Sequence, residues 1–184
     1  MRSLRLFVTL LVCIFAAVAV HAQKGRSDSR SDPRDPLTDA QHEQIVESGI
    51  FPNERVGLYT KFINQHADVI QGLIKRAEAG RDARMEGELE DLTELIDELA
   101  SNLDTFGERK ADIRASLTPL LESIHRWQQI LQSIAPRSGF ETSRDEAIDA
   151  IHDLATQTTD LIAEQKKYFE EHKDEAGQDR AEPK

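Results

Sequence analysis

Hydrophobic residues recur every three or four positions between Leu37 and His172. This spacing matches one face of an α-helix, whereas a strand would alternate. The most regular stretch contains two segments with steps of four and three: Met85, Leu89, Leu92, Ile96, Leu99, Leu103 and Phe106, then Ile113, Leu117, Leu120, Ile124, Trp127, Leu131 and Ile134. Such seams are typical of helices packed side by side. The sequence therefore predicts an all-α fold, an antiparallel helical bundle of three or four major helices behind a short leading helix.

Two arrangements satisfy the pattern over residues 82–134, because the seven-residue repeat passes through Gly107 without a change of phase. The first is one long central helix, kinked where Pro119 removes a backbone donor. The second is a hairpin that turns near Gly107, where Thr105 and Glu108 have the spacing of a capping box.

Capping residues and helix breakers predict where the first helices begin and end. Thr38 and Gln41 have capping-box spacing before the leading helix, which should stop at Gly49. The next helix should open at Pro52, since proline suits the first turn, and should end at Gly80.

The later boundaries follow from the same signals. Asp82 is expected to cap the third helix, and Pro119 to kink its segment or to start a helix after Thr118. Residues 135–142 should form a loop. Ser143 and Glu146 then have the spacing of a capping box for the last helix.

The first residues have the organisation of a secretory signal peptide. Arg2 and Arg5 precede an apolar run from Leu6 to Val20, and Val20-His21-Ala22 has the pattern of a cleavage site. As a helix the run would be about 22 Å long, shorter than the ~30 Å hydrocarbon core of a bilayer. We therefore expect a signal peptide over 1–22, cleaved after Ala22, and a mature protein that is periplasmic or secreted.

Two polar segments flank the helical part. Residues 23–36 and 173–184 mix charges of both signs and have no large apolar side chain, so neither can bury enough surface to offset its ordering entropy. We expect a disordered leader over 23–36, a single helical-bundle domain over 37–172 and a disordered tail over 173–184.

The net charge of the chain limits the kinds of molecule that we expect it to bind. The formal net charge is −11, and losing Arg2 and Arg5 with the signal peptide would make it −13. Nucleic acids and anionic membranes repel such a surface, so we expect no nucleic-acid binding and no stable membrane insertion after cleavage. The one cysteine, Cys13, lies in the predicted signal peptide. The mature protein would therefore have no disulfide and no thiol nucleophile.

At three places along the chain, a carboxylate residue lies three positions before a histidine. Helical bundles hold metal ions with this spacing. The pairs are Glu122–His125, Asp149–His152 and Asp39–His42. The seams place the first pair on the outer face of its helix and the second beside its seam, whereas a metal site inside a bundle needs ligands that point inward. We therefore expect surface ion pairs and no metal ligand among them.

His66 differs from these histidines because it lies in the middle of an apolar stripe. Three interpretations are open: a haem or metal ligand, a pH-sensitive switch, or a buried histidine bonded to a backbone carbonyl or to water. A hairpin that pivots near Gly80 would set His66 level with residue 94, about 13 Å from Met85. We therefore expect no haem held between His66 and Met85.

The last helix has the weakest seam, because Thr158 and Gln165 interrupt it. We expect a partly wet edge helix, or one that detaches or meets a ligand. Trp127 lies on a seam and is expected to pack in the core.

Sequence motifs for catalysis are missing from the chain. His42-Glu43 begins like the zinc-protease signature, but Val46 stands where the second histidine is required. The glycine and serine motifs of nucleotide-binding and hydrolase sites do not occur either.

Leu37-Thr38-Asp39-Ala40-Gln41 matches the pattern L-T-x-x-Q and resembles the motif of the Spy and CpxP group of periplasmic helical proteins. The resemblance implies an ATP-independent chaperone or an inhibitor of stress signalling. It covers five residues. Those proteins carry the motif twice, whereas Leu117-Thr118 in this chain continues with Pro119 and has Leu121 in place of the glutamine.

These observations predict an exported, non-enzymatic helical module. We expect it to bind another protein, or itself, through an apolar helix face, or to have a structural role in the cell envelope. We expect no catalytic residue, no metal ligand and no cofactor. Two alternatives stay open: a periplasmic holdase-type chaperone, and a ligand- or metal-binding bundle with His66 as the first candidate ligand.

Overall fold

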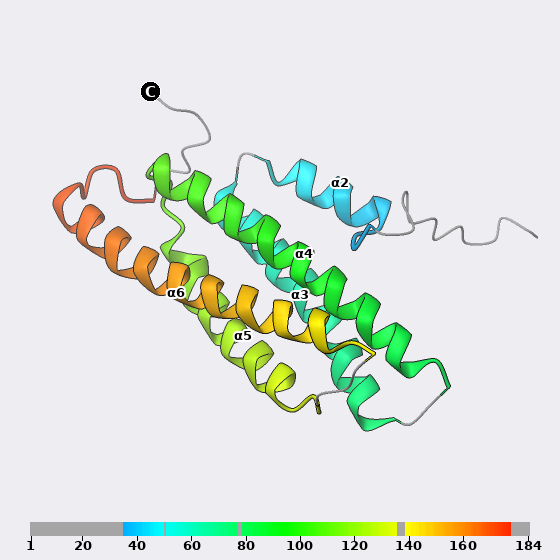
Figure 1. Ribbon diagram of the computed structural model, residues 1–184. Helices are drawn as coiled ribbons and strands as arrows, with labels where there is room; N and C mark the ends of the chain where they lie inside the picture. Colours follow the sequence, from blue (N-terminus) through cyan, green and yellow to red (C-terminus); the bar gives the residue numbers. More distant parts are fainter. Residues whose placement is uncertain (1–34, 50, 77–78, 136–138, 178–184) are drawn as a thin grey trace, which may run out of the picture.

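The structure is a computed structural model that describes residues 35–49, 51–76, 79–135 and 139–177. These residues form helices and no strand (Figure 1), which confirms the prediction of an all-α fold. The helices are α2 (Asp39–Glu47), α3 (Pro52–Lys75), α4 (Arg81–Glu108), α5 (Arg114–Gln132) and α6 (Glu141–Glu171). The predicted signal peptide 1–22 lies outside the described residues, as does the predicted leader 23–36 except for Asp35 and Pro36.

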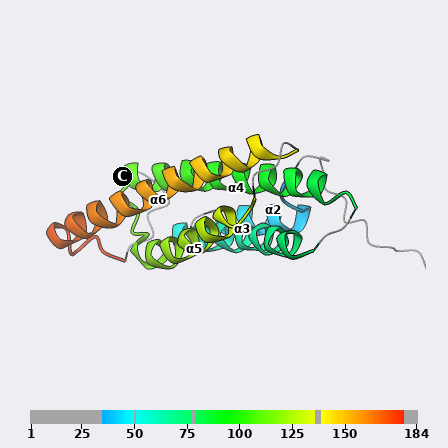
Figure 2. The same cartoon turned by 60° about the horizontal axis from the view of Figure 1, so that its bottom comes forward.

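The four long helices lie in two layers, α3 with α5 and α4 with α6 (Figure 2). Within the first layer the helices run in the same direction, because Asn53 of α3 bonds Ser116 of α5 and Asn64 bonds Trp127 further along both. Between the layers, α3 packs on α4 and α5 packs on α6. The short helix α2 packs on α3.

The second layer is also parallel. Gln157 of α6 donates to the carbonyl of Ala100 in α4, and Gln165 donates to the carbonyl of Ala111 just beyond α4. None of the described helices combines the length and the apolar character that a bilayer span requires.

The two heptad seams supply the core between these layers. Every apolar seam residue from Met85 to Phe106 and from Ile113 to Ile134 is at most 8% exposed. Burying a side chain of this size contributes about 1.5–3 kcal/mol relative to leaving it in water. Trp127 is fully buried, which confirms its predicted place in the core.

The chain turns between α4 and α5, so the turn predicted near Gly107 is confirmed and the single long helix is wrong, although α4 and α5 do not pack on each other as the helices of a hairpin would. Lys110 adopts a left-handed conformation with φ of 53°. Its N–H donates to the carbonyl of Gly107 at 3.1 Å, and the N–H of Ala111 donates to that of Phe106 at 3.0 Å. These two bonds form a Schellman motif, which ends a helix by satisfying its last carbonyls.

Some predicted helix ends are wrong because tertiary contacts or backbone geometry set them instead. Thr105 lies inside α4 and donates to the carbonyl of Ser101, so it caps no helix. Helix α3 ends at Lys75, before Gly80. Gly80 instead has φ of 75° and is the N-cap residue of α4, so Asp82 lies inside the helix.

The start of α5 and of α6 also differs from expectation. Pro119 lies inside α5, which begins before it, so no helix starts after Thr118. Helix α6 begins at Glu141 rather than at the predicted Ser143–Glu146 capping box. Its N-cap residue is the buried Phe140, which indicates that packing of the aromatic ring positions this end.

Candidate functional site

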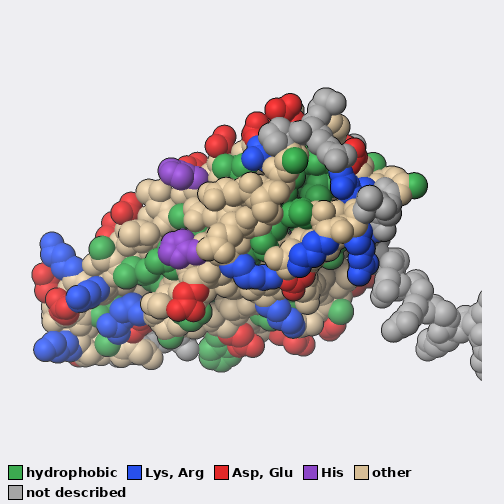
Figure 3. All heavy atoms as spheres, turned by 90° about the horizontal axis from the view of Figure 1, so that it is seen from below, with side chains coloured by type: hydrophobic (Ala, Val, Ile, Leu, Met, Phe, Trp, Pro, Cys, Tyr) green, Lys and Arg blue, Asp and Glu red, His purple; other side chains and the backbone are tan. Residues whose placement is uncertain are grey.

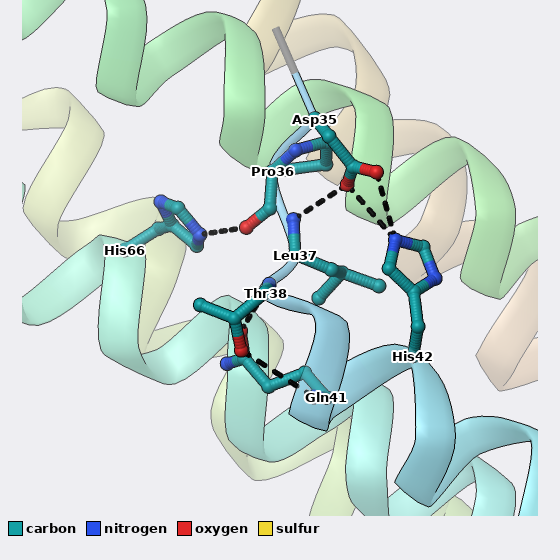
Figure 4. Close-up of polar contacts among 7 residues, drawn as sticks. All are labelled: Asp35, Pro36, Leu37, Thr38, Gln41, His42 and His66. Carbon is teal, nitrogen blue, oxygen red and sulfur yellow. Dashed lines mark hydrogen bonds and ion pairs between the residues drawn. The ribbon is translucent and has the colours of Figure 1, made fainter. Parts of the chain in front are cut away.

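Titratable side chains from α3 and α4 converge at His66. Its Nδ1 lies 2.9 Å from Oε2 of Glu88 and 4.0 Å from Oδ2 of Asp91. Its Nε2 lies 3.1 Å from the carbonyl oxygen of Pro36 (Figure 4). The side chains of His66, Glu88 and Asp91, which we call the His66 cluster, are 10%, 20% and 13% exposed, so the cluster is largely buried but reaches water.

The helix pattern explains why these residues meet. Glu88 and Asp91 are separated by three residues and therefore lie on the same face of α4. Leu89 and Leu92 beside them are fully buried, as are Ile63 and Ile70 on the turns before and after His66, so the core holds both helices in register. The sequence predicted residue 94 opposite His66. The observed partners lie earlier because α3 ends before the predicted pivot at Gly80.

The residues before α2 complete this site. Asp35 accepts a hydrogen bond from the N–H of Leu37 at 2.8 Å and lies 2.8 Å from Nε2 of His42 (Figure 4). Leu37 is 1% exposed, and Pro36 is also buried. The chain therefore enters α2 along a fixed path that turns the carbonyl of Pro36 toward His66.

The predicted capping box at the start of α2 is confirmed. The N–H of Gln41 donates to Oγ1 of Thr38, and the N–H of Thr38 donates to Oε1 of Gln41. This reciprocal pair satisfies two backbone donors at the helix end. The L-T-x-x-Q segment therefore has a local structural role here.

The surroundings of His66 favour the protonated, positively charged form of its imidazole. Burial of the imidazole lowers the pKa of His66, but the hydrogen bond and charge of Glu88, the charge of Asp91 and the carbonyl of Pro36 together outweigh it and raise that pKa above its usual value. Both ring nitrogens face oxygen acceptors, and only the protonated ring can donate to both.

The other histidines named from the sequence do not form such a group. Histidine side chains reach the surface seen in Figure 3, and both His125 and His152 are exposed. His42 pairs with Asp35, and His152 lies 3.7 Å from its neighbour Asp153. Within the part of the chain that the structure describes, the His66 cluster is the one group of three metal-ligating side chains.

A second polar group lies where α4 turns into α5, and we call Asp112, Arg114 and Gln165 the junction cluster. Arg114 donates to Asp112 from Nε at 2.8 Å and from Nη2 at 2.7 Å. The N–H of Gly177 donates to Oδ2 of Asp112 at 2.7 Å. The hydrogen bond from Arg114 is the largest cause that holds the pKa of Asp112 below its usual value.

Gln165 ties α6 to the same turn. Its Oε1 accepts from the N–H of Ile113 at 3.1 Å, and its Nε2 donates to the carbonyl of Ala111 at 2.8 Å. Gln165 is 5% exposed and Thr158 is fully buried, so the expectation of a partly wet edge at these residues is wrong. Gln165 interrupts the apolar seam because it satisfies backbone groups of the α4–α5 turn.

An open groove of about 420 Å³ lies between α3 and α5. Gly57, Ala115 and Pro119 make its lining small, and Lys61 and Asn64 supply polar atoms. Asn64 accepts hydrogen bonds from the Trp127 indole and from Arg126 through its Oδ1. Its amide nitrogen is therefore the atom that it can offer to a ligand.

Sequence reasoning missed Glu88 and Asp91 as partners of His66, because they lie in an acidic run that looks like a solvated helix face. Their i, i+3 spacing, set beside one histidine on a neighbouring apolar stripe, is the signal that could have found them.

Comparison with protein-family models, with curated proteins and with solved structures finds no match for this chain.

Proposed function

We propose that this protein is an exported, non-enzymatic helical module that binds a helical segment of another protein in the groove between α3 and α5. Its four long helices act as one bundle in solution. The first 22 residues are removed as a signal peptide, so that binding occurs in the periplasm or outside the cell.

The observation that carries the proposal is the uneven charge of the two layers. Helices α4 and α6 contain nineteen carboxylates and five Lys or Arg, a formal charge of −14. Helices α3 and α5 contain three carboxylates and five Lys or Arg, a formal charge of +2. The groove therefore lies on the layer that a protein surface can approach without strong repulsion.

The chemistry of the groove suggests the kind of segment it would hold. Gly57 is exposed, and a side chain added there would meet no atom within 4 Å, so a partner can come close to the backbone of α3. Lys61 and the amide nitrogen of Asn64 are hydrogen-bond donors. We infer a partner helix with a carboxylate for these donors and small or aliphatic residues against Gly57 and Ala115.

The alternatives fit the groove and the surface less well. Lys61 is the one ionisable residue among the groove's lining residues, so there is no acid–base pair for catalysis. A holdase needs a broad apolar surface. Among the described residues, the exposed large hydrophobic side chains are those of Val46, Phe51 and Val69.

The test is photo-crosslinking in intact cells from position 115, with position 163 on α6 as the control, because Ala115 and Ala163 are both exposed. An adduct with a defined helical segment at 115 but not at 163, followed by binding of that segment as a purified peptide, supports the proposal. An adduct with a second copy of this chain, or equal adducts at both positions, overturns it.

Matched variants sharpen the result. Gly57→Trp fills the groove, whereas Gly87→Trp places the same side chain on α4, where a side chain also meets no atom within 4 Å. We expect Gly57→Trp to abolish peptide binding, Lys61→Glu to weaken it about tenfold, and Gly87→Trp to leave it unchanged. Equal losses in both tryptophan variants would contradict the groove as the binding site.

A further inference from the structure

The His66 cluster has the donor set of a small metal site. Each of its three side chains offers one ligand atom, a nitrogen from the imidazole and an oxygen from each carboxylate. These three atoms lie within 4.8 Å of one another. The closest pair is Nδ1 of His66 and Oε2 of Glu88 at 2.9 Å, and Oδ2 of Asp91 lies 4.0 Å from the same nitrogen. The three side chains come from two helices that the core already holds in register.

The position of the Pro36 carbonyl also fits a metal-binding histidine. Both ring nitrogens face acceptors, so the neutral imidazole can carry its hydrogen on either one. In the tautomer protonated at Nε2, this N–H donates to the Pro36 carbonyl 3.1 Å away. The lone pair of Nδ1 then faces Glu88 and Asp91. Metal-binding histidines commonly donate their other ring N–H to a backbone carbonyl in this way, which fixes both the tautomer and the ring orientation.

We propose that Nδ1 of His66, Glu88 and Asp91 bind one divalent transition-metal ion, with Zn²⁺ as the best fit and water in the remaining position. Zinc–ligand bonds of about 2.0–2.2 Å place tetrahedral ligand atoms about 3.3–3.6 Å apart, so small side-chain rotations close the cluster around the ion. Two carboxylates also balance the charge of a divalent ion. Ca²⁺ and Mg²⁺ fit less well because they prefer six or more oxygen ligands, or several retained waters.

A bound ion would do more than link α3 to α4. His66 also holds the carbonyl of Pro36, and the same segment continues through the buried Leu37 into α2. The ion would therefore strengthen the attachment of α2 and the preceding residues to the bundle. This inference does not depend on the groove between α3 and α5.

The test is titration of the metal-stripped mature chain with zinc chloride, followed by calorimetry and thermal unfolding. We expect one ion per chain, a higher melting temperature with zinc, and binding at least about tenfold weaker in Glu88→Gln and Asp91→Asn. Calcium chloride should not raise the melting temperature. No heat of binding, or unchanged affinity in both variants, overturns the proposal and leaves the cluster as an ion pair of protonated His66.

A matched control and a direct readout complete the test. Glu122→Gln alters a carboxylate three residues before the exposed His125 and should leave zinc affinity unchanged. Nitrogen-15 NMR of the histidine rings should show the zinc-dependent shift at Nδ1 of His66, with Nε2 still protonated. A shift at Nε2 of His66, or an equal loss of affinity in Glu122→Gln, overturns the assignment. Circular dichroism verifies that each variant is folded.

Discussion

The His66 cluster and the junction cluster are both small polar groups set against the same apolar bundle, yet they differ in what balances their charge. At the junction, Asp112 meets the permanent positive charge of Arg114 and a backbone N–H. At His66, two carboxylates face one imidazole, which carries a positive charge only when it is protonated. The positive charge at the junction is permanent, whereas the positive charge at His66 has to come from a proton or from a bound cation.

The largest effect is expected from replacing Gln165, the uncharged residue of the junction cluster. Gln165→Leu leaves the N–H of Ile113 and the carbonyl of Ala111 buried without their partner, which should lower the free energy of unfolding by about 3 kcal/mol. Urea unfolding followed by circular dichroism measures this loss. Gln157→Leu is the control, because Gln157 bonds the exposed Asp104 and the carbonyl of Ala100, which keeps its partner within α4, and it should cost about 0.5 kcal/mol. Equal losses would show that Gln165 does not close the turn.

The next effect tests the charged part of the junction. Asp112→Asn should lower the free energy of unfolding by about 2 kcal/mol at neutral pH, because Arg114 and the N–H of Gly177 lose a charged acceptor.

The loss in Asp112→Asn should depend on pH with a definite sign. The folded pKa of Asp112 lies below its ordinary value of 3.8, so the stabilisation by its charge is present above that value and disappears as the pH falls through the folded pKa. Urea midpoints of the variant and the original chain should therefore converge in acid. A gap between them that stays constant from neutral to acid pH would count against the charge pair.

A smaller effect is expected at Lys110, where a substitution should raise the free energy of unfolding. Lys110 holds a left-handed conformation that costs a residue with a β-carbon about 1–2 kcal/mol. Lys110→Gly should therefore raise the free energy of unfolding by about 1 kcal/mol, even though it loses the contact of Nζ with the Tyr168 ring. Arg109→Gly, where φ is −78°, is the control and should destabilise instead. Thermal unfolding distinguishes the two signs.

The smallest expected effect is the coupling between the two clusters. Most of α4 separates them, so zinc should raise the melting temperature of Asp112→Asn as much as that of the original chain, with a coupling energy below about 0.5 kcal/mol. Thermal unfolding of both chains with and without zinc measures this coupling. A zinc effect that vanished in Asp112→Asn would mean that the two clusters form one network.

The parts of the fold that repeat along the chain could be predicted from its sequence, and the parts made by single tertiary contacts could not. The heptad seams marked the core because their period follows from helix geometry. The Thr38–Gln41 cap was equally visible because both partners lie within one turn. The turn at Lys110 was less certain, since no glycine occupies its left-handed position.

The same contrast applies to the candidate site. Sequence reasoning identified His66 as unusual, because a histidine on an apolar stripe is out of place. Its partners, Glu88 and Asp91, depend on the register between two helices, and the register depends on where α3 ends. Gln165 looked like a weak point in a seam because the backbone groups that it satisfies belong to a turn more than fifty residues earlier.

The division of charge between the layers gives the molecule a strong electric dipole across its short axis. In the field of a cationic surface such a molecule rotates before it makes contact, so that α4 and α6 lead and the opposite side trails. Capture of this protein on a positively charged support would therefore be an oriented event, with α3 and α5 left facing the solution.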